Sequence, residues 1–427
     1  MKDYKNSHFK FIKSSPTAYH AVASVKERLV AEGYVELCEG EAWSLVEGGK
    51  SFVTRNGSSI IAFRRSAAHG FVITASHSDS PAFRVKASGE SALGTYTKLP
   101  VERYGGMILY SWLDRPLSIA GRVVVRTDDG IAVKLLNVDR DLLVIPSVAI
   151  HLNRTVNEKF SPNPAQDLIP LLGAGGERVE LVSLIATELG VKSEDIISHD
   201  LFLYSRDEGH AVGASGELLL SPRLDDLECV YSSLEAFLDA SEQGMIPVLA
   251  VFDNEEVGSD TKQGAASTFL FDTLSRIFPE RDEYLAALAS SYMVSADNAH
   301  AKHPNHPELS DADNAPTLNG GVVVKFNANQ KYTTDSISCA IFTEACRAAG
   351  VKHQTYYNRA DMPGGSTLGS IANTKVSIST VDVGLPQLAM HSAVETAGAH
   401  DLSDMVAVLT RLYSSYIDVK GDKIVIK

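Results

Sequence analysis

Five short polar segments of this 427-residue chain carry side chains that could bind metal ions, and each follows an apolar run. Together they supply two imidazoles and several carboxylates: His77 with Asp79, Asp225, Glu255 with Glu256, Asp297, and His391. Two adjacent divalent cations need such a set if they are to share one bridging carboxylate and a water molecule. The residue types therefore predict metal-assisted hydrolysis.

The segments that must position these residues are predicted to alternate between strands and helices. Strands are expected at 59–63, 71–76, 247–252, 292–296 and 376–383, and helices at 227–240, 263–278 and 402–416. Strands that alternate with helices favour a largely parallel sheet covered on both faces. We therefore expect an α/β/α sandwich.

The polar segments stand where such a sheet would build a site. Open α/β sheets bind their ligands beyond the carboxyl ends of the strands. His77, residues 253–256 and Asp297 all come directly after predicted strands, Asp225 stands at the start of a predicted helix, and His391 follows a loop after the last strand. We expect these five segments to converge.

The middle of the chain has a different, β-rich pattern. Residues 121–126 and 131–136 are predicted strands, and Asp128-Asp129-Gly130 between them favours a hairpin. Gly173 to Gly176 is most simply a turn, because the lysine and threonine of a phosphate-binding loop are missing. We expect a catalytic domain at 1–87 plus 221–427, with an inserted β-rich oligomerisation domain at 88–220.

Composition excludes several classes of function. The formal net charge of -14 argues against nucleic acid or an anionic membrane as a partner, since both require a basic face. The four cysteines lack metal-type spacing and are too few for a disulfide framework. The first residues show no apolar signal segment, and no later stretch approaches 18 apolar residues. We expect a soluble cytoplasmic protein.

Several motifs resemble one peptidase family in order over nearly the whole chain. They are His77-Ser78-Asp79-Ser80-Pro81, Ser221-Pro222-Arg223-Leu224-Asp225, Asp253-Asn254-Glu255-Glu256-Val257-Gly258-Ser259, Ser295-Ala296-Asp297-Asn298-Ala299-His300 and Ala389-Met390-His391-Ser392. The expected insert contributes residues 103–106, 112–115 and 150–152. The sequence is similar to the M18 family, the aspartyl aminopeptidases.

The resemblance implies a role for each metal-binding residue. Asp225 would bridge two divalent cations, with His77 and Asp297 completing one site and Glu256 and His391 the other. Oxygen and nitrogen donors without a thiolate suit zinc, and cobalt or manganese would also fit.

The resemblance also implies how the reaction would proceed. Asp79 would fix the tautomer of the His77 imidazole. Glu255 would act as the general base that takes a proton from the attacking water and delivers it to the leaving amine. The expected reaction is hydrolysis of the first peptide bond in substrates with a free N-terminus.

Two further residues and the assembly follow from the same resemblance. Lys325 matches a family lysine associated with acidic side chains, so Asp or Glu N-termini would be preferred. His151 resembles a histidine that reaches into a neighbouring subunit's site. The family commonly forms tetrahedral dodecamers, so we expect a homo-oligomer. Residues 359–367 resemble the family's glycine-rich substrate loop only loosely.

Other interpretations of these residues stay open. Lone histidines are usually structural, which we expect of His69, His199, His210 and His353. Pro304 and Pro307 interrupt the spacing of His300, His303 and His306, so these three cannot share one helical face. Lys325 could be a surface lysine. Alternative functions are a broader-specificity aminopeptidase, a co-catalytic deacylase or carboxypeptidase on the same architecture, and a non-catalytic assembly protein.

Overall fold

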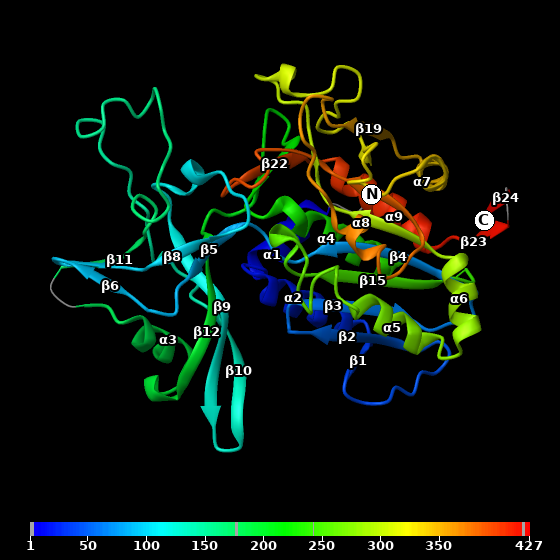
Figure 1. The fold of residues 1–427 in the computed structure, drawn as a ribbon, viewed down its shortest axis with the longest axis horizontal. Helices are drawn as coiled ribbons and strands as arrows, with labels where there is room; N and C mark the ends of the chain where they lie inside the picture. Colours follow the sequence, from blue (N-terminus) through cyan, green and yellow to red (C-terminus); the bar gives the residue numbers. More distant parts are fainter. Residues whose placement is uncertain (1–3, 176–177, 242, 421–422) are drawn as a thin grey trace. The chain divides into compact units, whose positions relative to one another are not determined.

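A nine-stranded sheet organises the first of two units in the computed structural model, which describes residues 4–175, 178–241, 243–420 and 423–427. Its strands run in the order β1 (Val35–Leu37), β2 (Lys50–Arg55), β3 (Ser59–Arg64), β15 (Ile246–Phe252), β4 (Phe71–His77), β16 (Tyr292–Ala296), β20 (Ser379–Gly384), β18 (Val322–Phe326) and β19 (His353–Tyr357) (Figure 1). The four central strands β15, β4, β16 and β20 are parallel, whereas β3 and β18 pair with them antiparallel. The sheet is therefore mixed around a parallel centre.

Helices cover both faces of this sheet. Successive residues of a strand point to opposite faces, so Ile60 packs in one hydrophobic cluster and Ile61 in the other. The first cluster contains residues of α1 (Lys5–Ser14), α2 (Ala18–Ala31), α4 (Leu224–Asp239), α7 (Ser336–Ala349) and α9 (Asp401–Tyr413), and the second contains residues of α5 (Phe269–Ile277), α6 (Arg281–Ala289) and α8 (Leu368–Ala372). The predicted α/β/α sandwich is confirmed.

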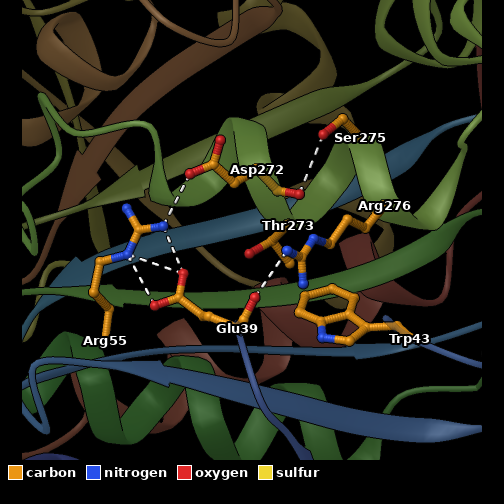
Figure 2. Close-up of a pocket in the computed structure, with 7 residues that line it drawn as sticks. All are labelled: Glu39, Trp43, Arg55, Asp272, Thr273, Ser275 and Arg276. Carbon is orange, nitrogen blue, oxygen red and sulfur yellow. Dashed lines mark hydrogen bonds and ion pairs between the residues drawn. The ribbon is translucent and has the colours of Figure 1, made fainter. Parts of the chain in front are cut away.

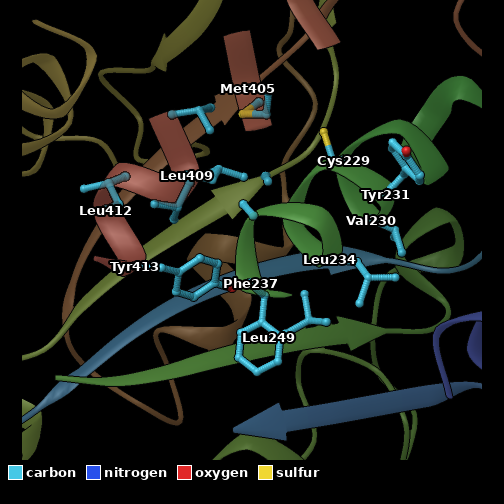
Figure 3. Close-up of a cluster of buried hydrophobic side chains, with 14 of the residues drawn as sticks. Cys229, Val230, Tyr231, Leu234, Phe237, Leu249, Met405, Leu409, Leu412 and Tyr413 are labelled. Atoms are coloured by element: carbon cyan, nitrogen blue, oxygen red, sulfur yellow. The ribbon is translucent and has the colours of Figure 1, made fainter. Parts of the chain in front are cut away.

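Helix α4 is buried along almost its entire length. Phe237 of α4 lies between Leu249 of the sheet and Tyr413 of α9, as Figure 3 shows. Even the polar residues Ser232 and Ser233 of this helix are fully buried. Burial on all sides fixes the start of α4, where Asp225 stands, against the sheet.

Two predicted elements begin later than the sequence suggested. The helix expected at 263–278 begins at Phe269, because the backbone of the preceding residues bonds locally: Gly264 N–H donates to Thr261 and Ala266 N–H to Ser259. The strand expected at 376–383 begins at Ser379, since Val376 N–H still bonds to Ala372 at the end of α8. Local hydrogen bonds shorten both elements.

The first unit also contains two smaller sheets. One has the order β13 (His210–Val212), β14 (Leu218–Ser221), β22 (Glu395–Gly398), β21 (Pro386–Leu388) and β17 (Ala299–His300), and the other pairs β23 (Ile417–Lys420) with β24 (Lys423–Ile426). Short 3-10 helices lie at Glu255–Val257 and Pro307–Leu309. No helix in the described part of the chain has the length and apolar character that crossing a membrane requires.

The second unit comprises residues 80–208 and 391–394. Its main sheet is antiparallel, in the order β10 (Gly130–Asn137), β9 (Leu117–Thr127), β12 (Ile196–Ser205), β5 (Ala82–Val85) and β8 (Val101–Tyr104). A small sheet has the order β11 (Leu171–Ala174), β7 (Tyr96–Lys98) and β6 (Ser91–Leu93), and the helices are α3 (Leu181–Leu189), Leu109–Trp112 and Ser193–Asp195. The predicted hairpin is confirmed by β9 and β10.

The two units change over at positions other than the expected 87/88 and 220/221. The second unit begins at Ser80, because β5 pairs with β8 and β12, and the first unit resumes at Gly209, because β13 pairs with β14. Of the stretch Gly173 to Gly176, Gly173 lies in β11 and Gly176 is outside the described residues.

Candidate metal centre

The carboxyl ends of the central parallel strands bring three of the polar segments together. Phe252, the last residue of β15, pairs with His77, the last residue of β4. On the other side of β4, β16 ends at Ala296, directly before Asp297. Residues 253–256 and Asp297 therefore leave neighbouring strands on either side of His77.

His77 lies between carboxylates and is buried. Its Nε2 is 3.7 Å from Asp225 Oδ1, and its Nδ1 is 3.4 Å from Asp79 Oδ1 and 3.0 Å from the Asp79 backbone oxygen. Burial lowers the pKa of His77, but the charges of Asp226 and Asp79 outweigh it and raise this pKa well above its usual value. The surrounding carboxylates therefore favour the charged form of the imidazole.

Asp79 also holds the turn that carries the two glutamates. Its Oδ1 accepts a hydrogen bond from Glu255 N–H (3.1 Å), and its Oδ2 accepts one from Glu256 N–H (3.2 Å). Asn254 enters this turn with φ of 61°, a left-handed conformation that asparagine tolerates well. One buried carboxylate thus orients the backbone of Glu255 and Glu256 as well as the His77 ring.

Ligand atoms of these residues converge to metal-binding separations. Oxygen and nitrogen atoms of His77, Asp225 and Asp226 lie within 4.8 Å of one another, as do those of His77, Glu255 and Glu256. Carboxylate oxygens of Asp225 and Glu256 also lie within 4.8 Å. A single cluster in the first unit therefore contains one imidazole and at least four carboxylates.

This cluster concentrates negative charge in a buried space. Burial raises the pKa of Glu255 to about 8; His77 lowers it, and the charges of Asp297 and Glu256 raise it further. Burial also raises the pKa of Asp226 well above the usual range, and Oδ1 of Asp226 has no hydrogen-bond partner among the described residues. Divalent cations would offset this charge, so the residues fit a metal site.

Lys325 lies at the edge of the cluster and is only 3% exposed. Its Nζ is 3.3 Å from Asp297 Oδ1 and 5.5 Å from the centre of the Tyr332 ring. Burial lowers its pKa, but Asp297, Tyr332 and Asp382 outweigh that effect and raise the pKa, so the ammonium stays charged. The interpretation of Lys325 as a surface lysine is therefore wrong.

Asp226 is one site residue that the sequence reasoning missed. It lies in the cluster, and its Oδ2 accepts a hydrogen bond from His77 N–H at 3.1 Å. The doubled aspartate at 225 and 226 was the only signal available. Glu395 was also missed: its Oε2 accepts a hydrogen bond from Asp225 N–H at 3.0 Å.

His391 and His151 belong to segments of the second unit. His391 lies in the connection between β21 and β22 with φ of 68°, and its carbonyl accepts a hydrogen bond from Ile108 N–H. His151 is exposed in a turn. The proposed roles of both histidines stay predictions.

The remaining histidines differ from one another. Both ring nitrogens of His69 lie within hydrogen-bond distance of backbone oxygens, those of Gly244 (3.2 Å) and Ile417 (3.1 Å), which confirms its structural role. His303 and His306 lie in an exposed loop with ring centres 5.3 Å apart, and His306 pairs with Glu308.

A separate cleft of about 260 Å³ lies in the first unit between β2, α5 and the segment that follows β1 (Figure 2). Arg55 in this cleft pairs with Glu39 (2.5 Å) and Asp272 (2.9 Å), and Arg276 stacks on the Trp43 ring at 4.6 Å. Since Arg55 has carboxylate partners inside the cleft, we interpret these contacts as structural.

Comparisons with known proteins agree with the cluster. The family model described as aminopeptidase I zinc metalloprotease (M18) matches residues 11–413. A protein of Clostridium acetobutylicum named probable M18 family aminopeptidase 2 is 47% identical over 406 residues, which is 92% of this chain and 94% of that protein.

Solved structures of similar proteins share the fold. A chain of the cryo-EM structure of the Ape4 and Nbr1 complex has a TM-score of 0.93 and 34% identity, over 96% of this chain and 85% of that one. The S. cerevisiae mApe1 dodecamer has a TM-score of 0.85 and 26% identity, over 96% of each chain. With acids and an imidazole gathered at the carboxyl ends of its sheet, this chain belongs to the M18 family of metallo-aminopeptidases, hydrolases that act on peptides.

Proposed function

We propose that the chain is a two-metal aminopeptidase that prefers acidic N-terminal residues. The observation that carries this proposal is the convergence of His77, Asp225, Asp226, Glu255 and Glu256 at one edge of the sheet. One imidazole and several carboxylates exceed what a single divalent cation needs.

In this proposal, two cations would be held by His77, Asp225, Glu256, Asp297 and His391, with Asp225 shared between them. Zinc suits these ligands, and cobalt or manganese stays an alternative. When bound, the metals would act as Lewis acids that polarise the scissile carbonyl and lower the pKa of water.

Glu255 is the proposed general base. It lies in the cluster but outside the proposed ligand set, and burial raises its pKa above the usual value for glutamate, which makes it a stronger base. Asp79 holds the backbone of the Glu255 turn through its Oδ1, which keeps the base close to His77. The Glu255 carboxylate would carry the proton from the attacking water to the leaving amine.

Lys325 is the proposed determinant of substrate preference. A buried ammonium attracts a carboxylate far more strongly than an exposed one does. Asp297 already neutralises part of this charge from 3.3 Å. If Asp297 also binds a cation, Lys325 keeps positive charge that can attract a second carboxylate. The side chain of an N-terminal Asp or Glu residue would supply that carboxylate.

We further propose a homo-oligomer in which the second unit supplies subunit contacts and His151 reaches a neighbouring site. The edge strand β10 exposes Ile131 (70%), Val133 (62%) and Leu135 (42%), which occupy alternate positions and so share one face. The related mApe1 structure is a dodecamer. A tetrahedral arrangement and a cytoplasmic location stay predictions from the sequence.

The test is a substrate panel assayed after metal removal and reconstitution with zinc, cobalt or manganese. We expect two equivalents of metal per chain and faster hydrolysis of Asp and Glu amides than of leucine amide. N-acetylated versions of the same substrates should not be cleaved. Cleavage of the acetylated substrates would instead favour a deacylase or carboxypeptidase.

A further inference from the structure

Asn298 is a buried polar residue directly after Asp297, and the reaction described above does not use it. Its side chain is at the carboxyl end of β16 and only 2% exposed. A buried amide has four hydrogen-bonding positions to fill, two as donor and two as acceptor. The partners of this amide therefore show what it connects.

The Asn298 side chain bonds to the chain on both sides of the Asp225 segment. Its Nδ2 donates to the backbone oxygen of Leu224 at 3.1 Å, the residue immediately before Asp225. Its Oδ1 accepts from the Sγ of Cys229 at 3.1 Å and from Leu385 N–H at 3.3 Å. One side chain thus joins the end of β16 to the first turn of α4.

A second route leads from the same amide to Asp225. Nδ2 of Asn298 also donates to Gln387 Oε1 at 2.9 Å. Gln387 Nε2 donates to Glu395 Oε1 at 3.5 Å, and Glu395 Oε2 accepts from Asp225 N–H at 3.0 Å. Gln387 and Glu395 are 1% and 2% exposed, so water does not compete for these bonds. The two routes meet at the Leu224–Asp225 peptide bond, so they tie the backbone at Asp225 to Asn298 from both sides of that bond.

We propose that Asn298 is a positioning residue that fixes the separation of the Asp225 and Asp297 carboxylates before cations bind. This inference rests on the proposed two-metal function. Two buried carboxylates repel each other when no cation lies between them. Because Asn298 is covalently next to Asp297 and hydrogen-bonded next to Asp225, it resists their separation.

The experiment compares Asn298→Ala with Asn319→Ala as a matched control. Asn319 also joins two segments of the first unit, since its Nδ2 donates to the Glu217 backbone oxygen (2.8 Å) and its Oδ1 accepts from His400 N–H (2.9 Å). It is not adjacent to any proposed ligand. Zinc affinity is measured by competition with a chromophoric chelator, and the stability of each metal-free variant by thermal unfolding in EDTA.

We expect Asn298→Ala to weaken zinc binding by about 10- to 100-fold, the usual effect of losing a residue that orients a ligand. Asn319→Ala should bind zinc as the wild type does, although both metal-free variants lose stability. Equal zinc affinities for the two variants would overturn the positioning role. If Asn298→Ala does not fold, Gln387→Ala, which breaks only the second route, is tested in its place. Gln387→Ala should also weaken zinc binding, and a zinc affinity equal to that of Asn319→Ala would overturn the positioning role.

Failure of the proposed function would look different. A wild-type protein that binds none of zinc, cobalt and manganese would overturn the two-metal proposal, and the role of Asn298 with it. Unchanged zinc affinity in Asn298→Ala alone would overturn only the role of Asn298. The kinetic parameters give an independent readout. At saturating zinc we expect kcat to fall in Asn298→Ala while KM changes little, since Asn298 has no proposed contact with substrate.

Discussion

Replacing Glu255 with Gln should remove the proposed proton acceptor and keep the shape of the side chain. The backbone bond from residue 255 to Asp79 does not depend on the side chain, so the turn should persist. General base catalysis contributes about 10²- to 10⁴-fold, which corresponds to about 3–5 kcal/mol of barrier height. We therefore expect kcat to fall by that factor, with two zinc ions still bound.

The same substitution should change the pH dependence of the metal-free protein. An unfolded glutamate ionises near its usual pKa of 4.5, whereas burial raises the pKa of folded Glu255 to about 8. Between pH 4.5 and about 8, the folded state binds a proton on Glu255 that the unfolded state has lost. Rising pH therefore lowers the free energy of unfolding of the wild type. From pH 6 to 8 this effect can lower the free energy of unfolding by at most about 2.7 kcal/mol. Because the Glu255 side chain is only partly buried, we expect the metal-free wild type to lose about 1–2 kcal/mol of stability over this pH range.

The assay combines urea unfolding in EDTA at pH 6 and pH 8 with turnover at saturating zinc. Metal-free Glu255→Gln should lose less stability over this pH range than the metal-free wild type, because Gln cannot ionise. Metal content measured by mass spectrometry controls for loss of zinc. Wild-type turnover in a zinc-loaded Glu255→Gln protein would refute the assignment of the general base.

Three other perturbations test separate parts of the structure. Lys325→Ala should reduce hydrolysis of Asp and Glu substrates at least about tenfold more than hydrolysis of leucine substrates, or about 1.4 kcal/mol in selectivity; similar losses for all substrates would exclude Lys325 from specificity. Chelation should abolish activity and lower the unfolding temperature, and zinc at about 100 times its Kd should restore about 2.7 kcal/mol; unchanged stability in EDTA would contradict a bound metal. Burial lowers the pKa of His8 to about 3, so acid should destabilise the wild type from pH 6.5 downward. As the pH falls from 6.5 to 4.5, the free energy of unfolding of His8→Phe should fall by about 2–3 kcal/mol less than that of the wild type; an equal fall in both proteins would show that His8 is not the cause.

The location of the cluster could be predicted from the sequence, because it depends on local patterns of strands and helices. Alternating strands and helices imply a sheet with a parallel centre, and residues that follow parallel strands must meet at one edge. His77, Glu255 and Glu256 indeed share a cluster at that edge. Local hydrogen bonding limited the accuracy elsewhere, as in the turns before Phe269 that shortened the predicted helix.

The sequence by itself thus determined the fold class, the family resemblance and the candidate ligands. Only the tertiary structure decided that Lys325 is buried beside Asp297, that Asp226 joins the cluster, and that Asn298 holds the segment before Asp225. The physical reason is sequence separation. Asn298 and Leu224 are 74 positions apart, and their contact depends on strand order and on the burial of α4, which no periodicity within either segment records.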